Sequence, residues 1–300
     1  MILQLQKTTL AKRVVFLRGK EATTVNEIKL IALDMDGTLL TTDKRLTEEN
    51  RSALERAAAA GIEIVPATGR YYDAIPEPVR KLPFLHYAIT INGAQIYDIR
   101  NQRVLSRAEL PCETAIRLME YFDTLPVLYD CYQDNRGWIT EGLQAKAARF
   151  ARTKPVLDML EKFRIPVPEL KAHIREQGRS VQKVMAFFRD ETVRQQARDY
   201  LAKYFPETAV SSSVENNLEI NASLANKGNA LKLLADLLGI PMAQIMAFGD
   251  DLNDATMLRA AGIGVAMGNA TPAALAAADV QTASCDESGV AAAIRSLLGI

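Results

Sequence analysis

The chain has few of the side chains that build disulfide frameworks or soft metal centres. Its 300 residues include three cysteines and two histidines. Cys112, Cys131 and Cys285 lie far apart without a Cys-x-x-Cys pair, which predicts reduced core thiols and a cytoplasmic protein. His86 and His173 lack the spacing of a metal-binding cluster. Any metal binding or acid–base chemistry is therefore expected to rely on carboxylates.

Excess charge of one sign and long apolar runs are missing as well. Lys plus Arg and Asp plus Glu number 36 each, without a long block of either sign, so nothing favours a nucleic-acid groove. No apolar run reaches the roughly 20 residues that a membrane helix needs. We therefore expect a small-molecule partner, no nucleic acid and no membrane. The sequence does not indicate an oligomeric state.

The length suits two domains rather than a single core. Residues 1–27 begin with five basic and no acidic side chains among the first 20, and we expect them to form a loosely attached N-terminal extension. Residues 28–96 then show an apolar run, a helix that Thr47 can cap and Gly61 can end, and the strand-like IEIVP. Strand, helix and strand in this order predict a parallel βαβ unit.

Helices and short apolar strands alternate again in residues 213–300, which together with 28–96 predict a Rossmann-like parallel-sheet core. Residues 97–212 mix long helical patterns with strand-like VLYDCYQ, GWIT and VQKVMAFF. They predict an inserted α+β domain with a largely antiparallel sheet. The Gly-, Asn- and Ser-containing stretches ITINGAQIY and SSSVENNLEI are expected to connect the two domains.

Two carboxylates follow the first apolar run, in LIALDMDGTLL at residues 30–40. Strand alternation would aim Asp34 and Asp36 the same way, toward one point at the end of the strand. Like charges that close are unfavourable unless a cation lies between them, which indicates a metal or catalytic site. The alternative is a surface turn, because Asp-Gly is a common turn dipeptide.

Ligands of open parallel sheets bind beyond the carboxyl ends of the strands, and four junctions here carry suitable groups. They are DMDGT at 34–38, TGR at 68–70, Lys227 at the start of a helix, and GDDLND at 249–254. Each alone has an ordinary explanation: a turn, a surface charge or a helix cap. Their order and joint placement predict one site.

In that order the four motifs resemble those of the haloacid dehalogenase (HAD) superfamily, and within it the Cof-type phosphatases. The resemblance extends through GVAMGNA at 264–270 and ESGVA at 287–291 and covers nearly all of residues 28–300. It implies that the insertion at 97–212 is the large cap domain, which covers the active site and determines substrate specificity. Candidate leaving-group contacts in this cap are Tyr132, Trp138 and Lys183, with packing or surface roles as the alternative.

The resemblance also implies roles for the acidic residues. Asp34 would be the nucleophile that forms an aspartyl-phosphate, and Asp36 the general acid and later base, with its pKa raised by the neighbouring carboxylate. Mg²⁺ would be held by Asp34, the backbone carbonyl of Asp36 and Asp250. Asp254 would orient Lys227 or a metal-bound water.

Other residues would contact the phosphate or the remainder of the substrate. The phosphate-binding set implied by the resemblance is Thr68, the Gly69 amide, Lys227 and Asn253. Asn92, in INGA, is the candidate for substrate contact, and Asp251 is expected to be a solvated helix cap.

The function that the resemblance implies is a Mg²⁺-dependent phosphomonoester hydrolase for small phosphorylated metabolites, with sugar phosphates as the expected substrates. The presence of Asp36 argues against dehalogenases and P-type ATPases, which lack this second aspartate. A phosphosugar mutase or phosphotransferase uses the same intermediate and stays an alternative, as does a non-catalytic phosphosugar sensor.

Overall fold

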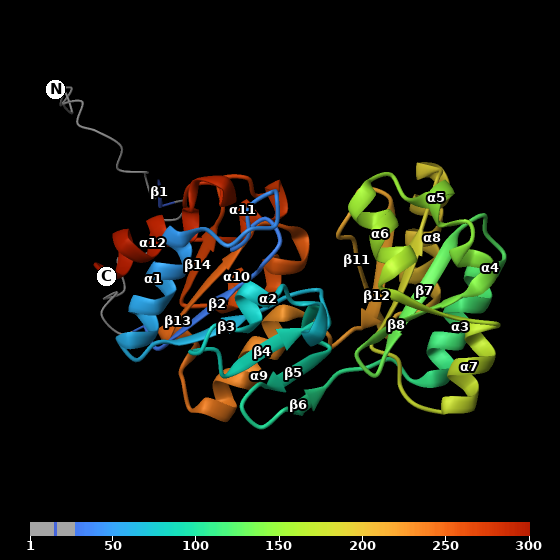
Figure 1. Cartoon of the computed structure of the whole chain (residues 1–300), viewed down its shortest axis with the longest axis horizontal. Coiled ribbons are helices and arrows are strands. Elements are labelled where there is room, and N and C mark those ends of the chain that lie inside the picture. Colours follow the sequence, from blue (N-terminus) through green and yellow to red (C-terminus); the bar gives the residue numbers. More distant parts are fainter. Residues whose placement is uncertain (1–14, 17–27) are drawn as a thin grey trace.

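The structure, a computed structural model, describes residues 15–16 and 28–300. Its first lobe is built on a six-stranded sheet in the order β1-β15-β14-β13-β2-β3, whose strands are parallel except for β1 (Figure 1). The strands are β1 Val15–Phe16, β2 Leu30–Leu33, β3 Glu63–Pro66, β13 Ile245–Gly249, β14 Ile263–Ala266 and β15 Val280–Gln281. The predicted N-terminal extension lies outside the described residues except for β1.

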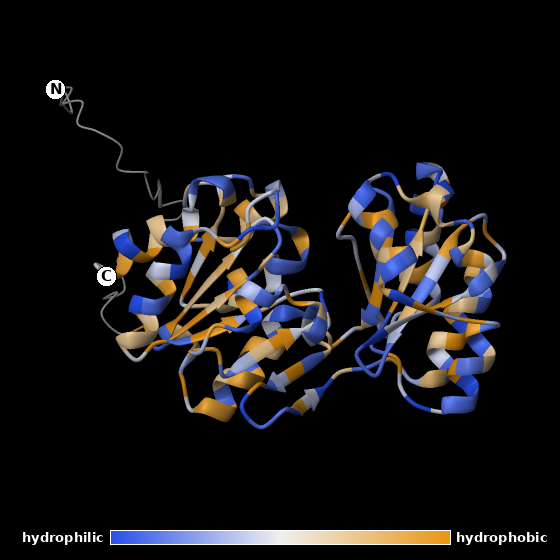
Figure 2. Cartoon of the chain, viewed as in Figure 1, coloured by the Kyte–Doolittle hydropathy of each residue, from blue (hydrophilic) through white to orange (hydrophobic). Residues whose placement is uncertain are grey.

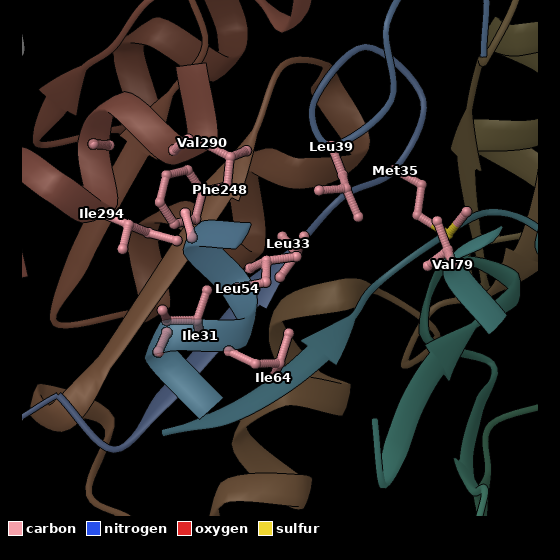
Figure 3. Close-up of a cluster of buried hydrophobic side chains, with 14 of the residues drawn as sticks. Ile31, Leu33, Met35, Leu39, Leu54, Ile64, Val79, Phe248, Val290 and Ile294 are labelled. Carbon is pink, nitrogen blue, oxygen red and sulfur yellow. The ribbon is translucent and has the colours of Figure 1, made fainter. Parts of the chain in front are cut away.

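Helices cover both faces of this sheet. On one face, α1 and α12 pack against strand residues such as Ile31, Leu33 and Phe248, which point toward Leu54 of α1 and Ile294 of α12 in Figure 3. The opposite face is covered by α9, α10 and α11. The helix bounds are α1 Glu48–Ala59, α9 Lys227–Leu238, α10 Ala255–Ala260, α11 Pro272–Ala277 and α12 Gly289–Leu298. This three-layer packing buries both sides of the strands and leaves their ends for the site.

Helix α1 begins and ends where the sequence predicts. The Thr47 hydroxyl accepts a hydrogen bond from the backbone N–H of Asn50 at 3.2 Å, which satisfies one of the free amides of the first turn. Gly61 follows the helix with φ +84°, a conformation that glycine adopts without strain. These two residues fix the return of the chain into β3.

A three-stranded antiparallel sheet extends the first lobe beyond β3. It consists of β4 Tyr87–Thr90, β5 Gln95–Asp98 and β6 Arg103–Arg107. A parallel bridge between Ala67 and Ile89 places β4 alongside the chain that leaves β3. The short helix α2, Glu77–Arg80, lies between β3 and β4 in the chain.

The second lobe contains another six-stranded sheet, which we call the cap sheet (Figure 1). Its order is β11-β12-β10-β7-β8-β9, antiparallel except for the β8–β9 pair. The strands are β7 Leu128–Gln133, β8 Arg136–Thr140, β9 Arg164–Val167, β10 Lys183–Phe187, β11 Thr208–Ser211 and β12 Asn217–Ala222. The helices are α3 Cys112–Asp123, α4 Glu141–Gln144, α5 Ala147–Phe150, α6 Lys154–Lys162, α7 Leu170–Gln177 and α8 Glu191–Tyr204. The predicted fold class, a parallel α/β core with an inserted α+β unit, is confirmed.

Strand pairing bears on where the two lobes meet, although the domain division itself stays a prediction. Residue 97 lies inside β5, which pairs with β4 and β6 of the first lobe. Residues 217–222 form β12, which pairs with β10 in the cap sheet. The chain therefore passes from one lobe to the other later in the sequence than the predicted boundaries at 97 and 213. Those boundaries are predicted from local Gly and Asn content, which hydrogen bonding between strands outweighs.

Hydropathy follows the layers. In Figure 2 the central strands of the first lobe are mostly apolar, while the helices alternate apolar and polar residues as their buried and exposed faces require. In the part of the chain that the structure describes, no helix combines the length and apolarity needed to cross a membrane.

Candidate active site

The first and fourth motifs meet because their strands are neighbours. Strands β2 and β13 are parallel with Leu33 opposite Phe248, so Asp34 and Asp250 leave the sheet at the same edge. The backbone N–H of Asp34 donates to the carbonyl of Phe248 at 3.0 Å and fixes this register up to the last strand residue. Two sequence-distant carboxylates are thus brought to one place by backbone pairing alone.

Lys227, the first residue of α9, lies between two of the carboxylates. Its Nζ donates to Asp34 Oδ1 at 2.5 Å and to Asp254 Oδ1 at 2.6 Å, and its side chain is fully buried. Burial acts to lower the pKa of Lys227, but the charges of Asp254 and Asp34 outweigh it and raise the pKa. The lysine is therefore a permanent cation beside Asp34, whose own pKa is raised because burial outweighs the lysine's charge.

Asp254 orients the rest of the fourth motif. Its Oδ2 accepts hydrogen bonds from the backbone N–H groups of Asp250 at 2.9 Å and Asp251 at 3.0 Å, while its Oδ1 binds Lys227. The predicted contact between Asp254 and Lys227 is present. Asp251 caps the short 3₁₀ turn at Leu252–Asp254, so the predicted capping role of Asp251 is confirmed.

One oxygen from each of Asp34, Asp250 and Asp254 lies within 4.8 Å of the others, which is a spacing that could hold a metal ion. Thr38 donates to Asp250 Oδ1 at 2.7 Å, and the other Asp250 oxygen makes no hydrogen bond among the described residues. Gly37 leaves room for the Asp250 carboxylate, because a Cβ at position 37 would lie 2.4 Å from Asp250 Oδ2. A cluster of carboxylate oxygens fits a hard divalent cation such as Mg²⁺.

We expect divalent-cation binding at this cluster to strengthen as the pH rises through neutrality. Burial, more than the neighbouring carboxylates, raises the pKa of Asp250 to about 7, so below that pH a proton competes with the cation. Mg²⁺ affinity, measured by calorimetry, should be about tenfold weaker near pH 6 than near pH 8.

The stability of the metal-free protein should also depend on pH. Since the folded-state pKa of Asp250 lies above its ordinary value, the metal-free protein loses stability as the pH rises through about 7, and Mg²⁺ restores it. The thermal shift caused by Mg²⁺ should therefore be larger at the higher pH. An equal shift at both pH values would contradict the assignment of the cation to Asp250.

Asp36 corrects two predictions. Its carboxylate is not part of the acidic cluster, because Arg70 binds it through Nε at 2.7 Å and Nη2 at 2.9 Å, and Lys44 binds it at 2.8 Å. Burial acts to raise the pKa of Asp36, but hydrogen bonding and charge from Arg70, with Lys44, hold it well below its usual range. The expected crowding with Asp34 and the expected raised pKa are wrong, since the strand ends at Leu33 and alternation does not continue past it.

Arg70 is therefore a site residue that the sequence analysis did not assign, although it ends the TGR motif. Its neighbours Thr68 and Gly69 occupy the same loop, and the Thr68 hydroxyl accepts the backbone N–H of Arg70 at 3.1 Å. Thr68 is 1% exposed, so its hydroxyl is held within the protein rather than on a surface turn.

Asn253 and Asn92 connect the first lobe to the cap sheet. Asn253 donates to the side-chain oxygen of Asn92 at 3.2 Å, and the Asn92 amide donates to Glu219 of β12 at 2.7 Å. Substrate contact by Asn92 stays a prediction, since its polar atoms bind protein groups here. Trp138 donates to the carbonyl of Gln133 at 3.1 Å and packs on His173, which supports its packing role.

The chain is similar to known phosphatases over most of its length. Residues 31–294 match the family model of haloacid dehalogenase-like hydrolases. Phosphatase YwpJ of Bacillus subtilis (strain 168) is 30% identical over 296 residues, which cover 90% of this chain and 100% of that protein. The 5-amino-6-(5-phospho-D-ribitylamino)uracil phosphatase YcsE of the same organism is 31% identical, and the match covers 90% of this chain and 95% of that protein. A solved haloacid dehalogenase-like hydrolase from B. subtilis is 28% identical with a TM-score of 0.77, and the match covers 89% of this chain and 99% of that chain.

Proposed function

The chain belongs to the family of haloacid dehalogenase-like hydrolases, and from this premise we propose that it is a Mg²⁺-dependent phosphomonoester hydrolase that acts through phospho-Asp34. The observation that carries the proposal is the arrangement of the buried Asp34 and Lys227 with the half-buried Asp250. A carboxylate is a weak nucleophile, and it attacks phosphorus when neighbouring cations neutralise the phosphoryl oxygens.

The proposed reaction has two steps. An Asp34 oxygen attacks phosphorus, the bond to the leaving oxygen breaks, and Asp36 gives that oxygen a proton. Asp36 then removes a proton from water, which attacks phosphorus and displaces Asp34 as free carboxylate with release of inorganic phosphate. Lys227, Asn253, Thr68 and the Gly69 amide would bind the phosphoryl oxygens.

The metal requirement rests on the acidic cluster. The carboxylates of Asp34 and Asp250 and the backbone carbonyl of Asp36 would hold Mg²⁺, with Asp254 binding Lys227 instead. Bound there, the cation neutralises charge on the phosphoryl group. The oxygen-only donor set and the free Asp250 oxygen support this assignment.

Asp36 must leave its resting partners before it can act as an acid. In the free protein it is an ionised carboxylate paired with Arg70 and Lys44. A substrate phosphate that attracts either cation would weaken the pairing and raise the pKa of Asp36 toward the working range. The salt bridge is thus a resting state of the catalytic acid.

We propose small phosphorylated metabolites, sugar phosphates foremost, as the substrates. The name of the relative YcsE, a phosphoribityl-type phosphatase, supports a phosphorylated polyol chain as one substrate class to test. The test is phosphate release from sugar phosphates, nucleotides and an aryl phosphate, with and without Mg²⁺. Metal-dependent release from any ester supports the proposal, and no release from all of them contradicts it.

We expect Asp36→Asn to slow hydrolysis most for esters that have poor leaving groups. An alkoxide leaving group needs a proton, whereas an aryl oxide leaves without one, so the acid matters only for the former. The ratio kcat/KM reports the first step alone, so it should fall by about 10²- to 10⁴-fold for sugar phosphates and much less for the aryl phosphate, while loss of the base in the second step lowers kcat for both. Equal losses of kcat/KM for both classes would contradict the assignment of Asp36 as the acid.

A further inference from the structure

A chain of buried polar groups runs from the cap sheet into two loops of the site. Lys183 of β10 donates to the backbone carbonyl of Gly69 at 3.2 Å and pairs with Glu219 of β12 at 3.1 Å. Glu219 accepts from Asn92 at 2.7 Å, and Asn92 accepts from Asn253 at 3.2 Å. Gly69 and Asn253 belong to the second and fourth motifs, so a cap ion pair connects both proposed phosphate-binding loops.

The pair is held out of water. The side chains of Lys183 and Glu219 are 2% and 4% exposed. Burial acts to raise the pKa of Glu219, but the charge of Lys183 and hydrogen bonds from Ser213, Lys183 and Asn92 outweigh it and keep the carboxylate ionised. A buried ion pair adds little stability over apolar residues of the same size, so stability alone does not account for it.

Lys183 already makes two hydrogen bonds within the protein. An ammonium group has three N–H donors. Gly69 and Glu219 accept hydrogen bonds from Nζ, which also lies 4.6 Å from the centre of the Tyr132 ring. The Tyr132 ring in turn contacts Tyr71, two residues after Gly69, edge to face at 5.5 Å. Two of the three donors of Lys183 thus hold Gly69 and Glu219, and its charge lies over the Tyr132 ring.

A strained turn places Asn92 between the loops. Ile91, Asn92 and Gly93 have φ of 53°, 56° and 93°, and a β-branched residue at positive φ is a backbone outlier. A Cβ on Gly69 would lie 2.9 Å from Asn92 Oδ1, so the close approach of the two segments needs glycine there. The surrounding contacts hold this geometry in place.

We propose that the Lys183–Glu219 pair is a positioning device for the phosphate site, which holds Gly69 directly and Asn253 through Asn92. The inference rests on the proposed function. It assigns Lys183 to positioning the loop that binds the phosphoryl group, and not to recognition of the leaving group. Loss of Lys183 should therefore weaken phosphate binding itself and slow all esters by one common factor.

The test compares the wild type with Lys183→Met and with Lys183→Met/Glu219→Gln. The double variant leaves no unpaired buried charge and keeps an acceptor for Asn92, so it isolates the contact to Gly69 even if the single variant folds poorly. The matched control is Lys171→Met, since Lys171 pairs with Asp123 on the outer side of the cap. Inorganic phosphate binding with Mg²⁺ present is measured by calorimetry, and kcat/KM for several esters by phosphate release.

We expect phosphate affinity and kcat/KM to fall by about 10- to 100-fold in the double variant, equally for all esters, with the control unchanged. Unchanged phosphate affinity, or losses that differ among leaving groups, would overturn the inference while the proposed function stands. A wild type that neither binds phosphate nor releases it from esters would overturn both.

Discussion

Replacing Asp34 by Asn is expected to reduce phosphate release by at least about 10⁴-fold, because an amide cannot form the acyl phosphate on which the proposed reaction depends. Lys227 would still have Asp254 as a partner, so the variant should fold. Steady-state phosphate release with Mg²⁺ measures the activity, and thermal unfolding verifies the fold.

The matched control is Asp251→Asn, the same chemical change at a nearby carboxylate. Asp251 caps a 3₁₀ turn, and Asn caps about as well as Asp, so its activity should remain within a few-fold of the wild type. Wild-type turnover in Asp34→Asn would exclude phospho-Asp34 and favour a different nucleophile. Equal losses of activity in Asp34→Asn and Asp251→Asn would show that the structure of the site, and not the nucleophile, had been damaged.

The core of the site could be predicted because parallel strands end at one edge. Asp34 and Asp250 follow buried apolar strands, so their meeting follows from sheet pairing. Lys227 joins them because α9, which it begins, packs against the same sheet. Asp36 could not be placed in this way. It lies three residues past the end of β2, where strand periodicity no longer applies, and its partner Arg70 comes from a separate loop.

The cap contacts lie further beyond sequence reasoning. Lys183 and Glu219 belong to β10 and β12, and their meeting depends on the register that sets Met185 opposite Glu219. Strand β10 is buried on both faces and its sequence KVMAF does not alternate, so the polar–apolar alternation of NLEINA in β12 has no matching pattern in β10 to mark the register. Strands β5 and β12 overlap stretches that the sequence predicts to be connections, because the pairing of a strand is not a local property.

Replacing Lys227 by Met is expected to damage both stability and activity. Asp34 and Asp254 would lose their buried cation, and removing one partner from a buried ion pair costs about 3–5 kcal/mol. Phosphate release should fall about 10³-fold, since a cation beside the phosphoryl oxygens is lost. Chemical denaturation measures the free energy of unfolding, and phosphate release the activity.

Two results would separate the loss of the Lys227 charge from the loss of its side-chain packing. With Lys227 gone the pKa of Asp34, already raised by burial, should rise further, so the stability deficit should shrink as the pH falls and grow as it rises. The double variant Lys227→Met/Asp254→Asn removes one of the stranded carboxylates and should regain much of the stability without regaining activity. A deficit independent of pH, or recovery of activity in the double variant, would contradict the role of Lys227 as the cation that both neutralises the buried carboxylates and binds phosphate.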